Sequence, residues 1–368
     1  MTPTAPQAAR RRVYGALRAG GPATRPELAR RLGLSLPTVI GAVDELLRQE
    51  LACLEDAPPG GRGRPAARVR LTPERLVVTA LDLGSPGVTG GRYDLHGTRL
   101  SHRTYGPPTS HLGSDPADTF DLLLKRLREQ GTAALSVVSI LGAVHPHERT
   151  LDSYALGLRG RRLEAELGAA LGWPVRVEND ANLCAWHAWH VLGLRREDPL
   201  VFLNYSHGIG LGLMLGGEVY HGATGAAGEV SFAADPAKRG RHELLARRLL
   251  RHLEAASPER SIADVAARAS AGDRPAGRAL RAYLADLTKH LTAVAAVLDP
   301  ALMVLQDIPH AAEPLRAEVQ RALGELGLHP GVMVSPLGPL GGLDSAGRYG
   351  GAQLEEVCLA ASAGVGTP

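Results

Sequence analysis

Apolar residues near the N-terminus recur every three or four positions, which is the spacing of amphipathic helices. They predict a short helix over residues 13–19 and a second helix that begins at Thr24 and is ended by Gly33. Thr24 and Glu27 have the spacing of a capping box, and glycine suits a left-handed helix end. Ser35 can cap a third helix. The apolar stripe of that third helix consists of Val39, Val43, Leu46 and Leu47.

Two short strands follow these helices, at residues 51–55 and 67–71, and the segment that joins them is rich in glycine and carries two arginines. Helices followed by such a hairpin are the pattern of a winged helix-turn-helix, whose recognition helix meets base edges with its N-terminal part. Arginine on a narrow loop can enter a minor groove. A small helical domain with a Gly-Arg-Pro linker is the alternative. The residues predicted to contact DNA are Ser35, Pro37, Thr38, Gly41, Arg62 and Arg64.

The charge of the chain is divided unevenly. Residues 1–75 contain 13 Arg and no Lys against 7 acidic residues, a net charge of +6. The remainder carries 28 basic against 31 acidic residues, a net charge of −3. Positive charge gathered on one small module is the expected footprint of phosphate binding, and it predicts affinity that falls steeply with salt.

Beyond Thr72-Pro73-Glu74, short apolar strands alternate with amphipathic helices, which indicates an α/β fold. We therefore expect a DNA-binding domain over residues 1–72 and a separate body over 73–368, with the first nine residues disordered. The predicted strands of the body cover residues 76–83, 92–95, 98–102, 136–144, 175–178, 200–205, 210–215 and 302–305. Its predicted helices include 118–130, 163–171, one opened by residues 178–182 and a last one near Gln353.

Composition excludes several classes of protein. No run of about 18 apolar residues could span a membrane, and the N-terminus has no apolar signal-peptide core. The cysteines Cys53, Cys184 and Cys358 are few, odd in number and far apart. They argue against a disulfide framework and a thiolate zinc cluster, and they fit a protein of the reducing cytoplasm.

Three motifs carry a family resemblance: Gly-Arg-Gly-Arg-Pro at 61–65, Glu-Asn-Asp-Ala-Asn at 178–182 and Gly-Ala-Ala-Gly-Glu at 225–229. Over essentially its whole length the chain resembles the winged-helix transcriptional regulators of the ROK family (repressors, open reading frames and sugar kinases). The resemblance implies a two-lobed, actin-like and ribonuclease-H-like body of the ATPase fold. It also implies a homodimer or a higher homo-oligomer.

In ROK kinases the aspartate of Glu-Asn-Asp is the catalytic base, and the resemblance places that role on Asp180; the alternative is that Asp180 caps its helix. The family's phosphate-binding loops are altered here. Pro86 stands in the first loop and removes an amide donor, and His207 replaces the threonine of the second. The late Gly-Gly pair is Gln306-Asp307. We therefore expect a vestigial base, no ATP turnover and no cofactor.

The family's sugar and zinc residues are partly replaced as well. Its Glu-x-Gly-His is Glu229-Val230-Ser231-Phe232 here, and residues 233–242 contain no cysteine, so we expect no structural zinc. Tyr154 stands where an asparagine is expected. Asn179, Asp180 and Glu229 remain able to bind hydroxyl groups. A sugar-type effector, another ligand or none are all open.

The other histidines do not indicate a functional site. His187 and His190 have the spacing of a metal pair on a helix, but each directly follows a tryptophan, Trp186 or Trp189, which favours packing or surface roles. Glu218, His221 and His207 receive no role.

The leading hypothesis is a cytoplasmic, dimeric transcriptional regulator, most simply a repressor, that binds a double-stranded DNA operator. An active sugar kinase with a DNA-binding appendage is a second hypothesis. The third is a DNA binder that responds to no ligand and whose body serves only dimerisation.

Overall fold

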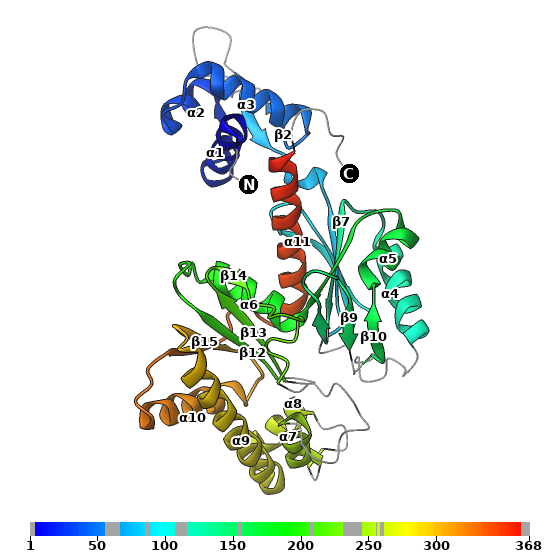
Figure 1. Cartoon of the computed structure of the whole chain (residues 1–368), viewed down its shortest axis with the longest axis vertical. Coiled ribbons are helices and arrows are strands. Elements are labelled where there is room, and N and C mark those ends of the chain that lie inside the picture. Colours follow the sequence, from blue (N-terminus) through cyan, green and yellow to red (C-terminus); the bar gives the residue numbers. More distant parts are fainter. Residues whose placement is uncertain are drawn as a thin grey trace.

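The computed structural model of the chain shows a small head above two lobes, with one long helix, α11, running from the lobes up to the head (Figure 1). Its described residues are 4–55, 67–84, 88–106, 116–153, 156–205, 209–230, 245–254, 256–257 and 261–361.

The head is a three-helix unit with a small three-stranded sheet. Its elements are α1 Ala5–Gly20, β1 Ala23–Thr24, α2 Arg25–Leu32, α3 Leu36–Arg48, β2 Ala52–Glu55 and β3 Arg68–Leu71. β3 pairs antiparallel with both β1 and β2, so the predicted hairpin is confirmed. The capping box is present, because Glu27 accepts from the Thr24 amide at 2.8 Å. Gly33 has φ 60°, the left-handed end that was expected, and Ser35 caps α3.

The prediction that the first nine residues are disordered is wrong for residues 5–9, which form the first turns of α1. The Thr4 amide donates to Gln7 Oε1 at 2.9 Å, which caps the helix. Ala9 is buried, and the Gln7 side chain donates to the Ala360 carbonyl. Contacts with the far end of the chain therefore extend this helix beyond its local signal.

The first lobe contains a mixed five-stranded sheet with the order β11-β7-β4-β5-β6. Strands β4, β7 and β11 run parallel, and β5 and β6 add an antiparallel meander. The predicted strand 136–144 is divided into two, because Gly142 has φ 140° and turns the chain. The lobe's elements are η1 Pro73–Arg75, β4 Val78–Asp82, β5 Thr89–Tyr93, β6 Arg99–Thr104, α4 Pro116–Gln130, β7 Leu135–Ile140, β8 Ala143–Val144, β9 Leu151–Ser153, β10 Leu158–Arg161, α5 Leu163–Leu171 and β11 Val175–Asn179.

The second lobe repeats that plan with a sheet of order β14-β13-β12-β15-β16, in which β12, β15 and β16 are parallel. Strand β16, a four-residue segment that the hydrophobic pattern did not predict, completes the edge by pairing with β15. The lobe's elements are β12 Leu200–Asn204, β13 Gly210–Leu215, β14 Glu218–Val219, α7 Leu245–Glu254, α8 Ile262–Ser270, α9 Arg274–Leu298, β15 Leu302–Leu305, α10 Ala312–Glu325 and β16 Gly331–Val334.

Two helices, α6 Asp180–Val191 and α11 Gly341–Ala360, pack against each other between the two sheets. Glycines let α11 lie close on the first lobe. A Cβ atom at Gly351 would stand 2.7 Å from the carbonyl oxygen of Leu95, closer than side chains approach backbone. At Gly347 a Cβ atom would strike the Tyr93 ring at 2.4 Å.

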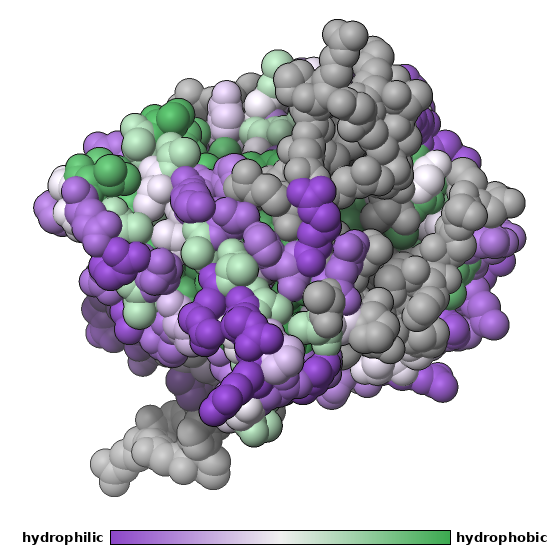
Figure 2. Space-filling view, turned by 90° about the horizontal axis from the view of Figure 1, so that it is seen from below, coloured by the Kyte–Doolittle hydropathy of each residue, from purple (hydrophilic) through white to green (hydrophobic). Residues whose placement is uncertain are grey.

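The head and the first lobe share one hydrophobic core. Tyr14 and Leu17 of α1 belong to the same buried cluster as Leu354 and Leu359 of α11. On the end of the body away from the head, hydrophilic side chains dominate the described surface, and hydrophobic residues occur in small groups (Figure 2). Within the described ranges, no helix is both long and apolar enough to cross a bilayer.

Candidate functional site

The outer face of α3 presents the predicted base-contacting residues. Ser35, Pro37, Thr38 and Gly41 are all exposed. Val39, Val43 and Leu46 are buried as predicted, and they fix which side of the helix faces outward. Arg62 and Arg64 lie outside the described residues, but the strands on either side of them pair from Ala52 with Leu71 to Glu55 with Arg68.

A buried arginine connects this face to the body. Arg10 of α1 donates through Nη1 to Glu45 of α3 at 3.1 Å. Its Nη2 donates to the carbonyl of Leu359 and, at 2.8 Å, to that of Ala361. The Arg10 side chain is 4% exposed, so water competes little for these contacts. Cations suit a helix C-terminus, and Arg10 therefore fastens α3 to the upper end of α11.

Exposed ion pairs surround this buried contact. Arg11 pairs with Glu356, and Arg18 pairs with Glu355 at 2.6 Å. Tyr14 places its hydroxyl 2.9 Å from His96 Nε2 in the first lobe. The head is thus attached to α11 and to the lobe by several elements at once.

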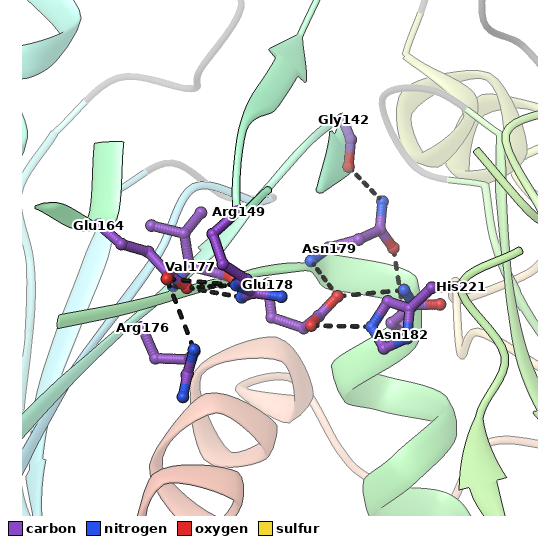
Figure 3. A network of polar contacts seen from close by, with 9 residues as sticks. All are labelled: Gly142, Arg149, Glu164, Arg176, Val177, Glu178, Asn179, Asn182 and His221. Atoms are coloured by element: carbon purple, nitrogen blue, oxygen red, sulfur yellow. Dashed lines mark hydrogen bonds and ion pairs between the residues drawn. The ribbon is translucent and has the colours of Figure 1, made fainter. Parts of the chain in front are cut away.

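In the body, the three predicted ligand residues lie together where β11 passes into α6. Asn179 Nδ2 donates to Glu229 Oε1 at 2.9 Å and to the Gly142 carbonyl at 3.0 Å. Asn179 Oδ1 accepts from the Asn182 amide, so Asn179, not Asp180, caps the helix (Figure 3). Glu229 belongs to the second lobe and Gly142 to the first, and Asn179 therefore bridges them.

A second bridge between the lobes was not predicted. Glu178 is fully buried and accepts from His221 Nε2 at 3.0 Å and from Asn182 Nδ2 at 3.1 Å (Figure 3). Burial opposes ionisation of Glu178, but the contacts with His221, together with hydrogen bonds from Asn182 and the Asn179 amide, outweigh it and hold the pKa of Glu178 below its ordinary value. The hydrogen bond to Glu178 raises the pKa of His221. The sequence could have suggested this bridge only through the general rule that a buried glutamate requires a hydrogen-bond donor.

Arginine and glutamate hold β11 from its other side. Arg149 donates to the Val177 carbonyl at 2.8 Å and pairs with Glu164 at 2.5 Å (Figure 3). Glu164 also accepts from the Val177 amide at 2.8 Å. These contacts satisfy both backbone groups of Val177 and fix the strand that presents Glu178 and Asn179.

Asp180 is buried beside other carboxyl groups. Asn204 Nδ2 donates to Asp180 Oδ2 at 2.7 Å. Burial, together with the charges of Asp82 and Glu229, raises the pKa of Asp180 to about 8. Burial also raises the pKa of Asp82 to about 6 and that of Glu229 to about 7. At neutral pH this site therefore holds protons that a cation or hydrogen-bond donors could replace.

A cavity of about 250 Å³ opens beside Asp180. Asp82, Asp180 and Asp307 line it, and none of its described lining residues is Lys, Arg or His. The first turn of α11 closes one side, where a Cβ atom at Gly342 would lie 2.7 Å from Asp82 Oδ2. Three carboxyl groups therefore line this cavity, and none of its described lining residues offers a cationic side chain to a phosphate.

Gln306, which stands in place of a family glycine, occupies the cavity wall. Its Oε1 accepts from the Tyr205 amide at 3.1 Å, directly before the altered second loop. That amide is consequently not available to a phosphate. Pro86, Tyr154, the 206–208 loop, Phe232 and residues 233–242 lie outside the described residues, so the expectations attached to them stay predictions.

The two tryptophan-flanked histidines have packing contacts. His187 is buried and its Nδ1 lies 2.9 Å from Ser345 Oγ of α11. Burial lowers the pKa of His187 to about 3, so it is neutral. The His190 ring packs against Trp186 with ring centroids 4.1 Å apart and ring planes inclined at 41°. In the described part of the chain, no group of three or more His, Cys, Asp or Glu residues could hold a metal ion.

The fold and these residues define a two-lobed ROK-type body with a winged helix-turn-helix head. A profile of the ROK family matches residues 78–354, and a winged helix-turn-helix DNA-binding profile matches residues 7–51. The chain belongs to the ROK family.

Its relatives include both regulators and enzymes. The xylose repressor of Bacillus subtilis is 23% identical over 342 residues, which cover 86% of this chain and 88% of that protein. The bifunctional enzyme NanE/NanK of Brucella melitensis is 33% identical over 193 residues, which cover 50% of this chain. That match spans only 36% of the length of NanE/NanK.

Solved structures share the fold. A ROK family transcriptional regulator described as a homolog of the E. coli MLC protein superposes with a TM-score of 0.71 at 21% identity. It covers 96% of this chain and 99% of its own. A ROK family glucokinase from Streptomyces griseus, in complex with glucose and AMPPNP, has a TM-score of 0.61 at 21% identity. It covers 74% of this chain and 99% of its own.

Proposed function

We propose that the chain is a cytoplasmic DNA-binding transcriptional regulator that acts as a repressor. Residues 1–72 form the DNA-binding head, and residues 73–368 form a sugar-kinase-like body without kinase activity. The observation that carries the proposal is the exposed face of α3 on a positively charged head that Arg10 fastens to the body. A homodimer would present two heads to two half-sites of one operator.

Ligand control is the second part of the proposal. Asn179, Asp180 and Glu229 would bind the hydroxyl groups of a sugar-type effector at the junction of the lobes. Such a ligand competes for the Asn179–Glu229 hydrogen bond and so changes how the lobes meet. It can shift the protein only if it binds one lobe arrangement more tightly than the other.

The route to the head is α11. Its first turn lies against Asp82 at the cavity, its second turn contacts α6 through Ser345 and His187, and the carbonyls at its far end bind Arg10. A displacement of its lower end would therefore move the heads of a dimer relative to each other, which is coupling through one rigid element.

Binding of the full chain to duplex DNA at several salt concentrations tests the main proposal. We expect the logarithm of affinity to fall steeply with the logarithm of salt concentration. Replacing Arg62 and Arg64 by alanine should lower affinity and reduce that slope by about 1 for each lost phosphate contact. A protein that ignores duplex DNA at low ionic strength would refute the proposal.

An active sugar kinase is the second candidate, and the buried group of Asn179, Asp180 and Glu229 favours it. The altered phosphate loops and Gln306, which occupies the Tyr205 amide, oppose it. Sugar-dependent ATP turnover that disappears in Asp180→Asn would establish the kinase instead. A thermal-shift screen of sugars separates ligand control from a ligand-independent DNA binder, because a true ligand raises the melting temperature by mass action.

A further inference from the structure

Two large apolar side chains stand in solvent on the recognition helix. Leu36 is 42% exposed and Ile40 is 39% exposed. They are one helical turn apart and lie on the same side of α3. The core of the head is filled by other residues of this helix, among them Val39 and Val43, which are fully buried. Leu36 and Ile40 are therefore not required to hold the head together.

The polar groups beside them are few. From Ser35 to Val43 the helix contains no Arg, Lys, Asn, Gln, Asp or Glu. Ser35 Oγ and Thr38 Oγ1 lie 2.7 Å apart and bond each other. The first charged residue on this helix, Asp44, is paired with Arg25 of α2 at 3.0 Å. The bidentate hydrogen bonds that usually identify guanine or adenine are therefore not available from the first two turns.

One base edge in the major groove carries an apolar group, and that group is the C5-methyl of thymine. We propose that Leu36 and Ile40 determine operator specificity by contacting thymine methyl groups, so that each half-site requires thymine at the contacted positions. The inference rests on the DNA binding proposed above and names the chemistry that the recognition helix reads.

Charge favours DNA over a protein partner as the occupant of this face. The head carries a net charge of +6, with 13 arginines in residues 1–75. Two side chains on one helical ridge also make an apolar area far below the roughly 800 Å² per partner of a stable protein interface. The same ridge is well matched to a methyl group in a groove that admits one α-helix.

The experiment uses duplexes that the full-length protein selects from a random library. In the best duplex each thymine is replaced in turn by deoxyuridine, which removes only the methyl group. We expect at least one position per half-site at which affinity falls by about three- to fourfold, the effect of burying one methyl-sized apolar group. A 5-methylcytosine at that position should bind more tightly than cytosine by a similar factor.

Alanine variants show which side chain contacts each thymine methyl group. Ile40→Ala or Leu36→Ala should bind the thymine and deoxyuridine duplexes equally at the position that each residue contacts. Val297→Ala removes an exposed apolar side chain from α9 in the second lobe, and it should discriminate as the parent does.

Two results would overturn the inference. One is a protein that binds its selected duplex but loses less than twofold at every deoxyuridine position. The other is an Ile40→Ala variant that loses self-association and keeps full discrimination, because the ridge would then be a contact between copies. Failure of the proposed function is distinguishable, since then no duplex is bound at low salt.

Discussion

The two ends of α11 face opposite chemical environments. At the head, cationic side chains meet carbonyl and carboxylate oxygens, and the buried Arg10 has partners on two helices. At the cavity, the carboxyls of Asp82 and Asp180 lie close to each other, and the pKa of each is raised. The head is thus firmly joined to α11, whereas the junction of the lobes holds buried carboxyl groups that favour their protonated form. Regulation is expected to act at the lower end.

The largest effect is expected from Arg10→Ala. It leaves the Leu359 and Ala361 carbonyls without their donor, whereas Glu45 keeps Arg48 at 2.5 Å. Two unsatisfied carbonyls of this kind cost about 3 kcal/mol together. Urea unfolding of the full chain measures this, and DNA affinity should fall as well. Arg11→Ala, one residue along, removes an exposed ion pair and should cost under about 1 kcal/mol. Equal effects of the two variants would contradict a special role for the buried contact.

Gly351→Ala tests how closely α11 lies on the first lobe. The new Cβ atom would stand 2.7 Å from the Leu95 carbonyl oxygen, and overpacking of this kind costs about 1–3 kcal/mol. Gly277→Ala in α9 is the matched control, because its Cβ atom would meet only the Arg281 side chain at 3.6 Å. The control should be neutral or stabilising. A tolerated Gly351→Ala would mean that α11 can separate from the sheet.

Asp180→Asn should stabilise the folded protein at high pH, whereas most substitutions of buried residues destabilise it. The pKa of Asp180 is raised to about 8, so the folded protein loses stability as pH rises from the ordinary aspartate range towards that value. The variant keeps a side-chain oxygen for Asn204 and cannot ionise. We expect it to exceed the parent by at least about 1 kcal/mol at pH 8, since one pKa unit is worth about 1.4 kcal/mol. Melting temperatures from pH 5 to 9 measure this; parallel curves for the two proteins would refute it.

The smallest effect is expected from His221→Gln. Because the pKa of His221 is raised by Glu178, its charge contributes stability that is fully present below the ordinary histidine pKa. That contribution is lost as pH rises through the raised pKa. The parent should exceed the variant by about 1 kcal/mol near pH 6 and by less above the raised pKa. His190→Gln, on the surface of α6, is the control. If the stability difference between the parent and His221→Gln grows with pH, Glu178 does not hold His221 in its charged form.

Local signals accounted for the head and for much of the sheets. The helix-capping residues have partners within four residues of themselves, so the sequence alone could predict their roles; they are Thr24, Glu27, Gly33 and Ser35. The same reading missed β16, whose four residues carry no clear period and which depends on pairing with β15. It also missed His221, since nothing near that residue in sequence indicates the buried Glu178, 43 residues away.

The sequence by itself determined the winged head, the uneven charge and the family motifs, because capping, periodicity and composition are properties of short segments. Only the tertiary structure decided that Arg10 binds carbonyls 349 and 351 residues further along the chain. It alone placed the Asp82 carboxyl against α11 and raised the pKa of Asp180. Such contacts depend on how whole elements pack, and burial shifts a carboxyl only when distant segments together remove its water.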